Sequence, residues 1–205
     1  MRRRVASTLA TGAAVAMAIG LSATSASAQQ EQWTIDPGGD YTATSGETLL
    51  TNTRNDVQLV CTSSEAAGML ETGASGTPAQ LGSIDQVAFS NCSGPLGLTF
   101  EVGQVGSWSI NGESFADGVT TGYVGGVEAN LTGPGCQATV TGEADGTYDN
   151  ASGTLALSPV ADSGHELVVS SVDPGNNCFG LIQQGDVVEY QGDYAITPAQ
   201  QISFG

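Results

Sequence analysis

Two tryptophans precede a cysteine by the same distance, and this spacing constrains the fold more than any other feature of the sequence. Cys61 follows Trp33 by 28 residues, and Cys136 follows Trp108 by 28 residues. Tryptophan occurs only twice and cysteine only four times in the 205 residues. Because residues of these types are so rare, the repetition of one interval between them indicates an internal repeat.

A second interval links each of the other two cysteines to an aromatic residue. Trp108 follows Cys92 by 16 residues, and Tyr194 follows Cys178 by 16 residues. In both places a glycine lies two residues before the aromatic residue. The match of a second interval, with similar flanking residues, favours duplication over coincidence.

The two intervals predict one domain, residues 29–205, that contains two related units. The units span about 33–107 and 108–193, and a repeat of their first strand, from Tyr194 onward, closes the array. A chain of this length buries a core of ordinary size as a single domain.

An isoleucine lies two residues after each aromatic residue that marks the units. Alternate side chains of a β-strand point to the same face, so each aromatic residue shares a face with its isoleucine. Such a pair is typical of a strand anchored in a hydrophobic core, and the alternative is an aromatic platform on which a ligand stacks. The expected core anchors are Trp33 with Ile35, Trp108 with Ile110, and Tyr194 with Ile196.

Residues 1–28 have the three parts of a secretory signal peptide. Three arginines at 2–4 precede an apolar run of small residues at 5–21, and Ala-Ser-Ala at 26–28 fits a cleavage site. We therefore expect a secreted protein, residues 29–205, that is released or associated with the cell wall.

The mature chain is strongly acidic. All 21 Asp and Glu residues lie beyond residue 28, where Arg54 is the only Lys or Arg, so the formal charge there is −20. This charge excludes nucleic-acid binding, which depends on Lys and Arg at the phosphates, and it disfavours anionic lipid surfaces. No later apolar stretch is long enough for a transmembrane helix, so we expect no transmembrane segment after signal cleavage.

Four cysteines in an exported chain predict two disulfides. Three pairings are possible, and the unit boundaries favour Cys61–Cys92 and Cys136–Cys178, one disulfide within each unit. A zinc site is disfavoured, because the sequence has no C-x-x-C pair and a single histidine.

Short β-rich runs separated by glycine-containing pairs predict an all-β, antiparallel fold. The runs include 57–60, 98–102, 138–141 and 167–172. Asn-Gly and Asp-Gly pairs favour tight turns because both residues tolerate a positive φ. The expected turn pairs are Asn111-Gly112, Asp117-Gly118, Asp145-Gly146 and Pro174-Gly175. The pattern leaves a two-sheet sandwich and a closed barrel equally open.

The pattern W-x-I…C-T-S-S…N-C…W-x-I-N…G-x-G-C…N-N-C…G-x-Y-x-I runs through most of the mature chain. It resembles a family of small secreted proteins from actinobacteria. The resemblance implies export. Because no activity is established for that family, the resemblance implies no catalytic residue and no ligand.

His165 is the only histidine and thus the only candidate imidazole base. Neighbouring residues in a strand point to opposite faces, so Glu166 is badly placed to orient the ring, and the sequence has no G-x-S-x-G nucleophile elbow. We expect His165 to be solvent-exposed at the start of a strand, and we expect no catalytic residue. Paired carboxylates are the alternative catalytic chemistry, but 21 acidic residues single out no pair.

The densest acidic string contains the candidate calcium ligands Glu143, Asp145 and Asp149. Its spacing lacks the alternating ligands and the final glutamate of an EF-hand loop. We therefore expect a hairpin turn with exposed acids, and we expect no metal and no cofactor.

Together, these features predict a secreted, non-catalytic binding or structural module that acts outside the cell or at its surface. The expected partner is an extracellular protein or a glycan, and nucleic acid is excluded. The alternative is a hydrolase of the envelope or of a polysaccharide that uses paired carboxylates.

Overall fold

The structure, a computed structural model, describes residues 31–205, and these residues form an all-β fold. The strands up to the middle of the chain are β1 (Gln32–Asp36), β2 (Gly39–Ser45), β3 (Thr48–Asn52), β4 (Val57–Cys61), β5 (Ser63–Leu70), β6 (Gly73–Ser75), β7 (Ala79–Ser90), β8 (Cys92–Ser93) and β9 (Thr99–Gln104). The remaining strands are β10 (Trp108–Ala116), β11 (Val119–Gly133), β12 (Cys136–Asp149), β13 (Thr154–Leu157), β14 (Leu167–Asn177), β15 (Val187–Thr197) and β16 (Gln201–Phe204). The predicted signal peptide lies outside the described residues.

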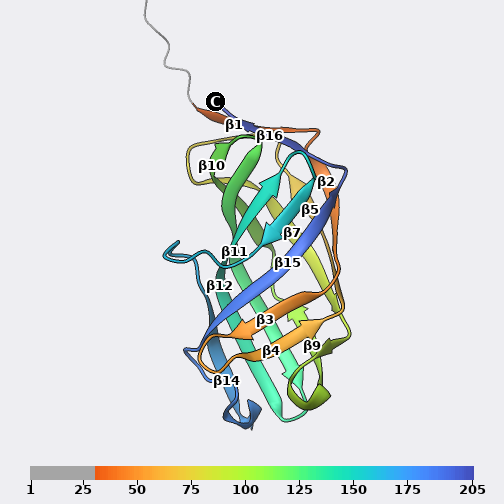
Figure 1. Cartoon of the computed structure of the whole chain (residues 1–205), viewed down its shortest axis with the longest axis vertical. Helices are drawn as coiled ribbons and strands as arrows, with labels where there is room; N and C mark the ends of the chain where they lie inside the picture. Colours follow the sequence, from red (N-terminus) through yellow and green to blue (C-terminus); the bar gives the residue numbers. More distant parts are fainter. Residues whose placement is uncertain (1–30) are drawn as a thin grey trace, which may run out of the picture.

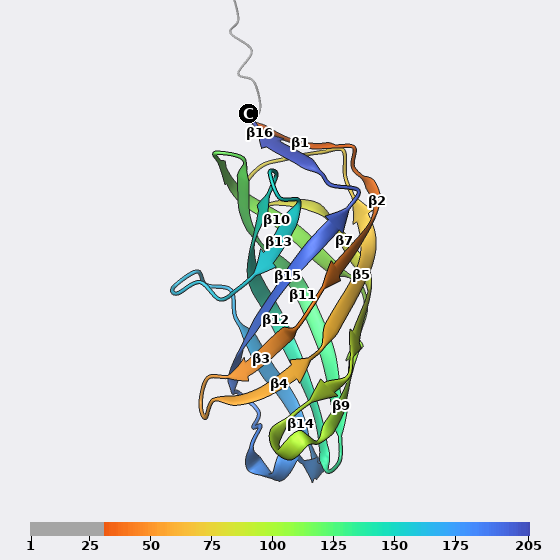
Figure 2. The same ribbon diagram turned by 45° about the vertical axis from the view of Figure 1, so that its right-hand side comes forward.

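The main sheet closes on itself, so the fold is a barrel rather than a sandwich (Figures 1 and 2). In one half of the barrel, neighbouring strands pair in the circular order β12, β13, β15, β2, β5, β7, β10, β11 and back to β12. Every one of these pairings is antiparallel, which confirms the predicted class. Closure leaves no unpaired edge in the ring.

A second ring of strands closes the other half of the barrel. Its circular order is β11, β12, β14, β15, β3, β4, β8, β9 and back to β11. Strands β11, β12 and β15 belong to both rings and run along the length of the molecule (Figure 1). The hydrophobic core lies inside this closed sheet, because inward-facing side chains alternate with exposed ones along the strands.

A small three-stranded sheet in the order β16-β1-β6 covers the upper end of the barrel (Figure 2). Trp33 of β1 is fully buried, and its ring lies 4.6 Å from that of Phe204 between centroids. Trp33 also lies close to Gly112 of β10, where a Cβ atom would approach the indole to 3.1 Å. The first and last strands of the described chain are therefore joined over one end of the core.

Both predicted disulfides are present. Cys61–Cys92 connects the end of β4 to the start of β8, and Cys136–Cys178 connects the start of β12 to the residue that follows β14. Each second cysteine opens or shortly precedes a short 3₁₀ turn, η1 (Pro95–Gly97) or η2 (Cys178–Gly180). The pairing expected from the unit boundaries is thus confirmed.

The internal repeat is not shown by the fold, because equivalent positions pair differently. Trp33 lies in the end-covering sheet, where β1 pairs with β16 and β6, whereas Trp108 lies in β10 of the closed barrel. Strand β11, which precedes Cys136, pairs with β12, which begins at Cys136. In contrast, β4, which ends at Cys61, pairs with β3 and β8. The repeat stays a prediction from spacing.

Three of the four predicted turns are wrong. Asn111-Gly112 lies inside β10 and Asp145-Gly146 lies inside β12. These glycines serve close packing instead of turning, since a Cβ atom at Gly112 would come within 2.7 Å of Leu81. Asp117-Gly118 does form a turn, and both of its residues have a positive φ. Pro174-Gly175 lies within β14.

No helix in residues 31–205 is long and apolar enough to cross a membrane.

Candidate functional site

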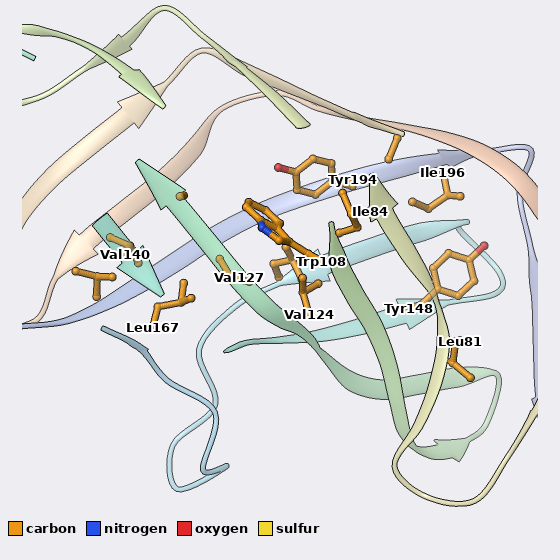
Figure 3. Packing of buried hydrophobic residues seen from close by; sticks show 14 of the residues in the cluster. Leu81, Ile84, Trp108, Val124, Val127, Val140, Tyr148, Leu167, Tyr194 and Ile196 are labelled. Carbon is orange, nitrogen blue, oxygen red and sulfur yellow. The ribbon is translucent and has the colours of Figure 1, made fainter. Parts of the chain in front are cut away.

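The barrel contains a cavity of about 90 Å³ between its two rings of strands. Figure 3 shows Trp108 among Ile84, Val124 and Tyr194, all of which line this cavity. None of the lining residues carries a charge. The cavity is therefore an apolar space inside the core and not a cleft on the surface.

Small side chains explain why the core leaves this space. Four alanines are among the residues that line the cavity: Ala43, Ala66, Ala129 and Ala144. An eight-stranded barrel has an interior that side chains just fill or that holds one small ligand. The short alanine side chains leave part of this interior unfilled.

A chain of hydroxyl groups crosses one wall of the cavity. The hydroxyl oxygens of Tyr190 and Tyr194 lie 2.6 Å apart, and Tyr194 donates to Ser64 Oγ at 2.9 Å. Burial raises the pKa of both tyrosine hydroxyls, so both are neutral in ordinary conditions. This wall is polar but uncharged.

Two further polar groups on the lining differ in their surroundings. The indole N–H of Trp108, a residue that is 8% exposed, has no hydrogen-bond partner within residues 31–205. The hydroxyl of Thr48, a residue that is 1% exposed, makes no hydrogen bond of ordinary geometry there, although its proximity to the Tyr190 hydroxyl lowers the pKa of that tyrosine against the larger effect of burial. Ser45 and Thr120 also have unpartnered buried hydroxyls, but they do not line the cavity. An unpartnered buried polar atom loses its hydration without compensation, so native proteins contain few of them.

His165 is placed differently from the prediction. Its side chain is only 12% exposed, it lies two residues before β14, and its ring stacks on Tyr123 with centroids 4.0 Å apart. Asp145 of β12, and not Glu166, orients the ring through a 2.8 Å contact with Nδ1. The expectation of an exposed histidine is wrong, because the ring contacts the carboxylate of Asp145, which is distant in sequence, and packs against the barrel.

The other histidine nitrogen faces carboxylates and not a nucleophile. Nε2 lies 3.6 Å from Glu113 Oε1 and 3.8 Å from Glu143 Oε2. The nearby Ser163 donates its hydroxyl to Asp145 Oδ2 and is therefore on the Nδ1 side. The arrangement within the described residues does not place a serine at Nε2, as a Ser-His-Asp triad requires.

The candidate calcium ligands do not form a metal site: Glu143 and Asp145 both lie beside His165, at opposite ring nitrogens. Asp145 is buried and accepts hydrogen bonds from Val160 N and Ser163 Oγ besides its contact with His165. Asp149 accepts a hydrogen bond from the backbone N–H of Ala151. Glu143, Asp145 and Asp149 lie in β12, so the expected exposed hairpin turn is wrong. No group of His, Cys, Asp or Glu in residues 31–205 is suited to hold a metal ion.

The aromatic and isoleucine residues singled out in the sequence lie in or against the core. Trp33, Ile35, Trp108, Tyr194 and Ile196 are buried, and Ile110 is partly buried against the same cluster. Trp108, Tyr194 and Ile196 also line the cavity. Residues from two of the three expected anchor pairs therefore belong to the candidate site.

Sequence reasoning missed the partner of His165 and the polar lining of the cavity. Asp145 lies 20 residues before His165 in the chain, and the signal for their contact is the pairing of β12 with β14, which local patterns do not reveal. Thr48 carried no signal beyond its position in a β-rich segment.

Comparison of the chain with protein-family models, with curated proteins and with solved structures finds no match. The candidate site is therefore argued from its own geometry.

Proposed function

We propose that the protein is a secreted, non-catalytic binding module that holds one small, mostly apolar molecule inside its barrel. The observation that carries this proposal is the apolar cavity of about 90 Å³ whose lining includes polar atoms without partners. The two disulfides support a place outside the cell, where such bonds persist. The presence of the purified protein in culture medium with Gln29 as its first residue would test the secretion.

The size of the cavity limits the ligand. A cavity costs about 24 cal/mol per Å³ of stability, so this one costs about 2 kcal/mol, which a well-fitting ligand recovers in part. An apolar cavity of about 150 Å³ is known to accept benzene. We therefore expect a ligand of about three or four non-hydrogen atoms, or a chemical group of that size at the end of a larger molecule.

The test is the binding of xenon and isobutene to the oxidised protein, followed by NMR of the methyl groups of Ile84, Val124 and Val127. We expect saturable shifts of these resonances, because all three residues line the cavity. The variant Ala129→Val fills part of the cavity and should weaken binding of both probes about tenfold. The matched control is Ala138→Val, which alters a buried alanine of the same core away from the cavity.

Two results would overturn this proposal. One is the absence of saturable shifts with either probe in the wild-type protein. The other is equal weakening by Ala129→Val and Ala138→Val, because that would place the effect in general core packing and not in the cavity. Thermal unfolding of both variants shows that each is folded before its binding is compared.

Hydrolysis by paired carboxylates is the second proposal. It is supported by the convergence of Glu113 and Glu143 on His165 Nε2, both within 4 Å. Its test is release of reducing sugar from a panel of envelope and plant polysaccharides, with Glu113→Gln and Glu143→Gln as controls. Activity that either variant abolishes would support hydrolysis, and a panel without product release would remove it.

A further inference from the structure

The two tryptophans of the chain differ in what their indole N–H groups bind. Trp33 Nε1 donates to the carbonyl oxygen of Gly76 at 2.9 Å. Trp108 Nε1 is also buried but has no acceptor within residues 31–205, and its ring lines the cavity. Buried indole N–H groups normally have a partner, so the difference needs an explanation.

A ligand explains the difference better than a lone water molecule. A buried water is held by about three hydrogen bonds to polar groups, whereas nearly all of the cavity lining is aliphatic or aromatic. A molecule that is itself mostly apolar can satisfy the aliphatic lining and still present one acceptor to Trp108. The uncharged lining also excludes an ionised ligand, since a buried charge needs a paired partner.

We propose that Trp108 donates its indole N–H to the ligand, and that the ligand is a small apolar molecule with one carbonyl or hydroxyl oxygen. This inference rests on the proposed function of the barrel interior as a binding site. Trp108 is then the residue that decides between an oxygenated molecule and a hydrocarbon of the same shape. A site that can hydrogen-bond one oxygen binds the analogue that lacks it more weakly, because its own polar group is left without a partner.

The experiment compares acetone with isobutene, which have the same shape and differ in one oxygen. The probe signals are the two indole N–H resonances of the oxidised wild-type protein. We expect acetone to shift the Trp108 resonance in a saturable manner and isobutene to leave it nearly unchanged. The Trp33 resonance is the internal control, because its N–H already binds Gly76, and it should not respond to either probe.

The variant Trp108→Phe tests the same donor through affinity. Removal of the indole enlarges the cavity for both probes alike, so the ratio of their dissociation constants isolates the hydrogen bond. We expect Trp108→Phe to lower the affinity for acetone relative to isobutene about fivefold, the usual effect of one neutral hydrogen bond. The matched control Trp33→Phe should leave this ratio unchanged, since Trp33 does not line the cavity.

The outcomes separate this inference from the function on which it rests. If neither probe binds, the proposed function fails and this inference fails with it. If both bind but acetone does not shift the Trp108 resonance, the barrel is a binding site and the assignment of Trp108 as donor is overturned. Should Trp108→Phe fail to fold, the indole resonances of the wild-type protein decide the question by themselves.

Discussion

The lower end of the barrel and the cavity differ in whether their buried polar groups have hydrogen-bond partners. At the lower end, the buried carboxylate of Asp186 accepts hydrogen bonds from Asn52 at 2.6 Å, from Gln183 N at 2.9 Å and from two nitrogens of Arg54 at 2.7 and 3.0 Å. In the cavity, Trp108 Nε1 and Thr48 Oγ1 have no partner within residues 31–205.

This difference distinguishes polar groups that stabilise the fold from polar groups that are available to bind another molecule. Only one Lys or Arg follows residue 28, and this residue, Arg54, is committed to Asp186. The pKa of Asp186 is lowered to about 2, chiefly by its hydrogen bond with Arg54, against the cost of burial. The chain satisfies its buried carboxylate completely, whereas Trp108 Nε1 has no partner in residues 31–205 and its residue lines an internal space. The buried hydroxyls of Ser45 and Thr120 are also unpartnered, but they lie away from that space. The combination of the open space and the unpartnered N–H is the reason to propose a ligand there.

The largest expected effect comes from removal of the satisfied carboxylate. Asp186→Asn replaces the charge that Arg54 and Asn52 bind, and we expect the free energy of unfolding at pH 7 to fall by about 2 kcal/mol, which corresponds to the lowering of the Asp186 pKa from 3.8 to about 2. The value is kept below the full equivalent of that shift, because the Arg54 side chain is 41% exposed and solvent screens the pair. Urea unfolding measures the change, and Asp193→Asn, an exposed carboxylate of the same strand β15, is the control.

The same variant should also change the response to acid. The pKa of Asp186 is about 2 in the folded protein and 3.8 ordinarily, so its ion pair contributes stability above pH 4 that is lost between pH 4 and pH 2. The difference in unfolding free energy between wild type and Asp186→Asn should therefore shrink across that interval. A difference that stays constant from pH 5 to pH 2 would show that the carboxylate charge does not contribute.

A middle-sized effect is expected at Asp145, which attaches the loop between β13 and β14 to the barrel. Figures 1 and 2 show this loop projecting from the side of the molecule. Asp145→Asn weakens the bonds to Val160 N, Ser163 and His165, and we expect a loss of about 1–2 kcal/mol.

Hydrogen exchange locates the effect of Asp145→Asn. The backbone amide of Val160 should exchange faster by about tenfold, while amides in β11 keep their protection. The control Asp162→Asn alters an exposed carboxylate of the same loop and should leave the Val160 amide unchanged. Equal exchange in wild type and Asp145→Asn would contradict the role of Asp145 as the anchor of the loop.

The smallest effect is expected at the cavity wall, where two buried hydroxyls differ in their bonding. Thr48→Val removes an unpartnered hydroxyl without a change of shape, so stability should stay equal or rise by less than about 1 kcal/mol. Ser64→Ala removes the acceptor of Tyr194 and should cost about 1 kcal/mol. Thermal unfolding measures both, and a loss in Thr48→Val as large as that in Ser64→Ala would show that Thr48 has a partner in the folded protein.

Features that depend on neighbouring residues were predictable from the sequence. The alternation of Trp33 with Ile35 and of Tyr194 with Ile196 places each pair on one face, because side chains alternate along any strand. The turn at Asp117-Gly118 follows from the positive φ that both residues accept. Where a glycine faces a neighbouring strand, as Gly112 faces Leu81, local pattern predicts a turn and tertiary packing overrides it.

Features of the candidate site were not predictable, because they depend on contacts between distant strands. His165 was expected to be exposed, and only the packing of its loop against β12 brings it to Asp145. The cavity depends on which alanines face inward at the same height in different strands, and Ala43 and Ala129 are 86 residues apart in the chain.

The sequence by itself determined the all-β class and favoured the observed pairing of the four cysteines among three possibilities, since β-propensity, turn residues and residue spacing are properties of the chain in one dimension. Only the tertiary structure decided that the sheet closes, that a cavity of about 90 Å³ remains inside it, and that Trp108 presents an N–H without a partner. The physical reason is that closure and residual volume depend on the register of strands distant in sequence, where a shift of one residue reverses which side chains face inward.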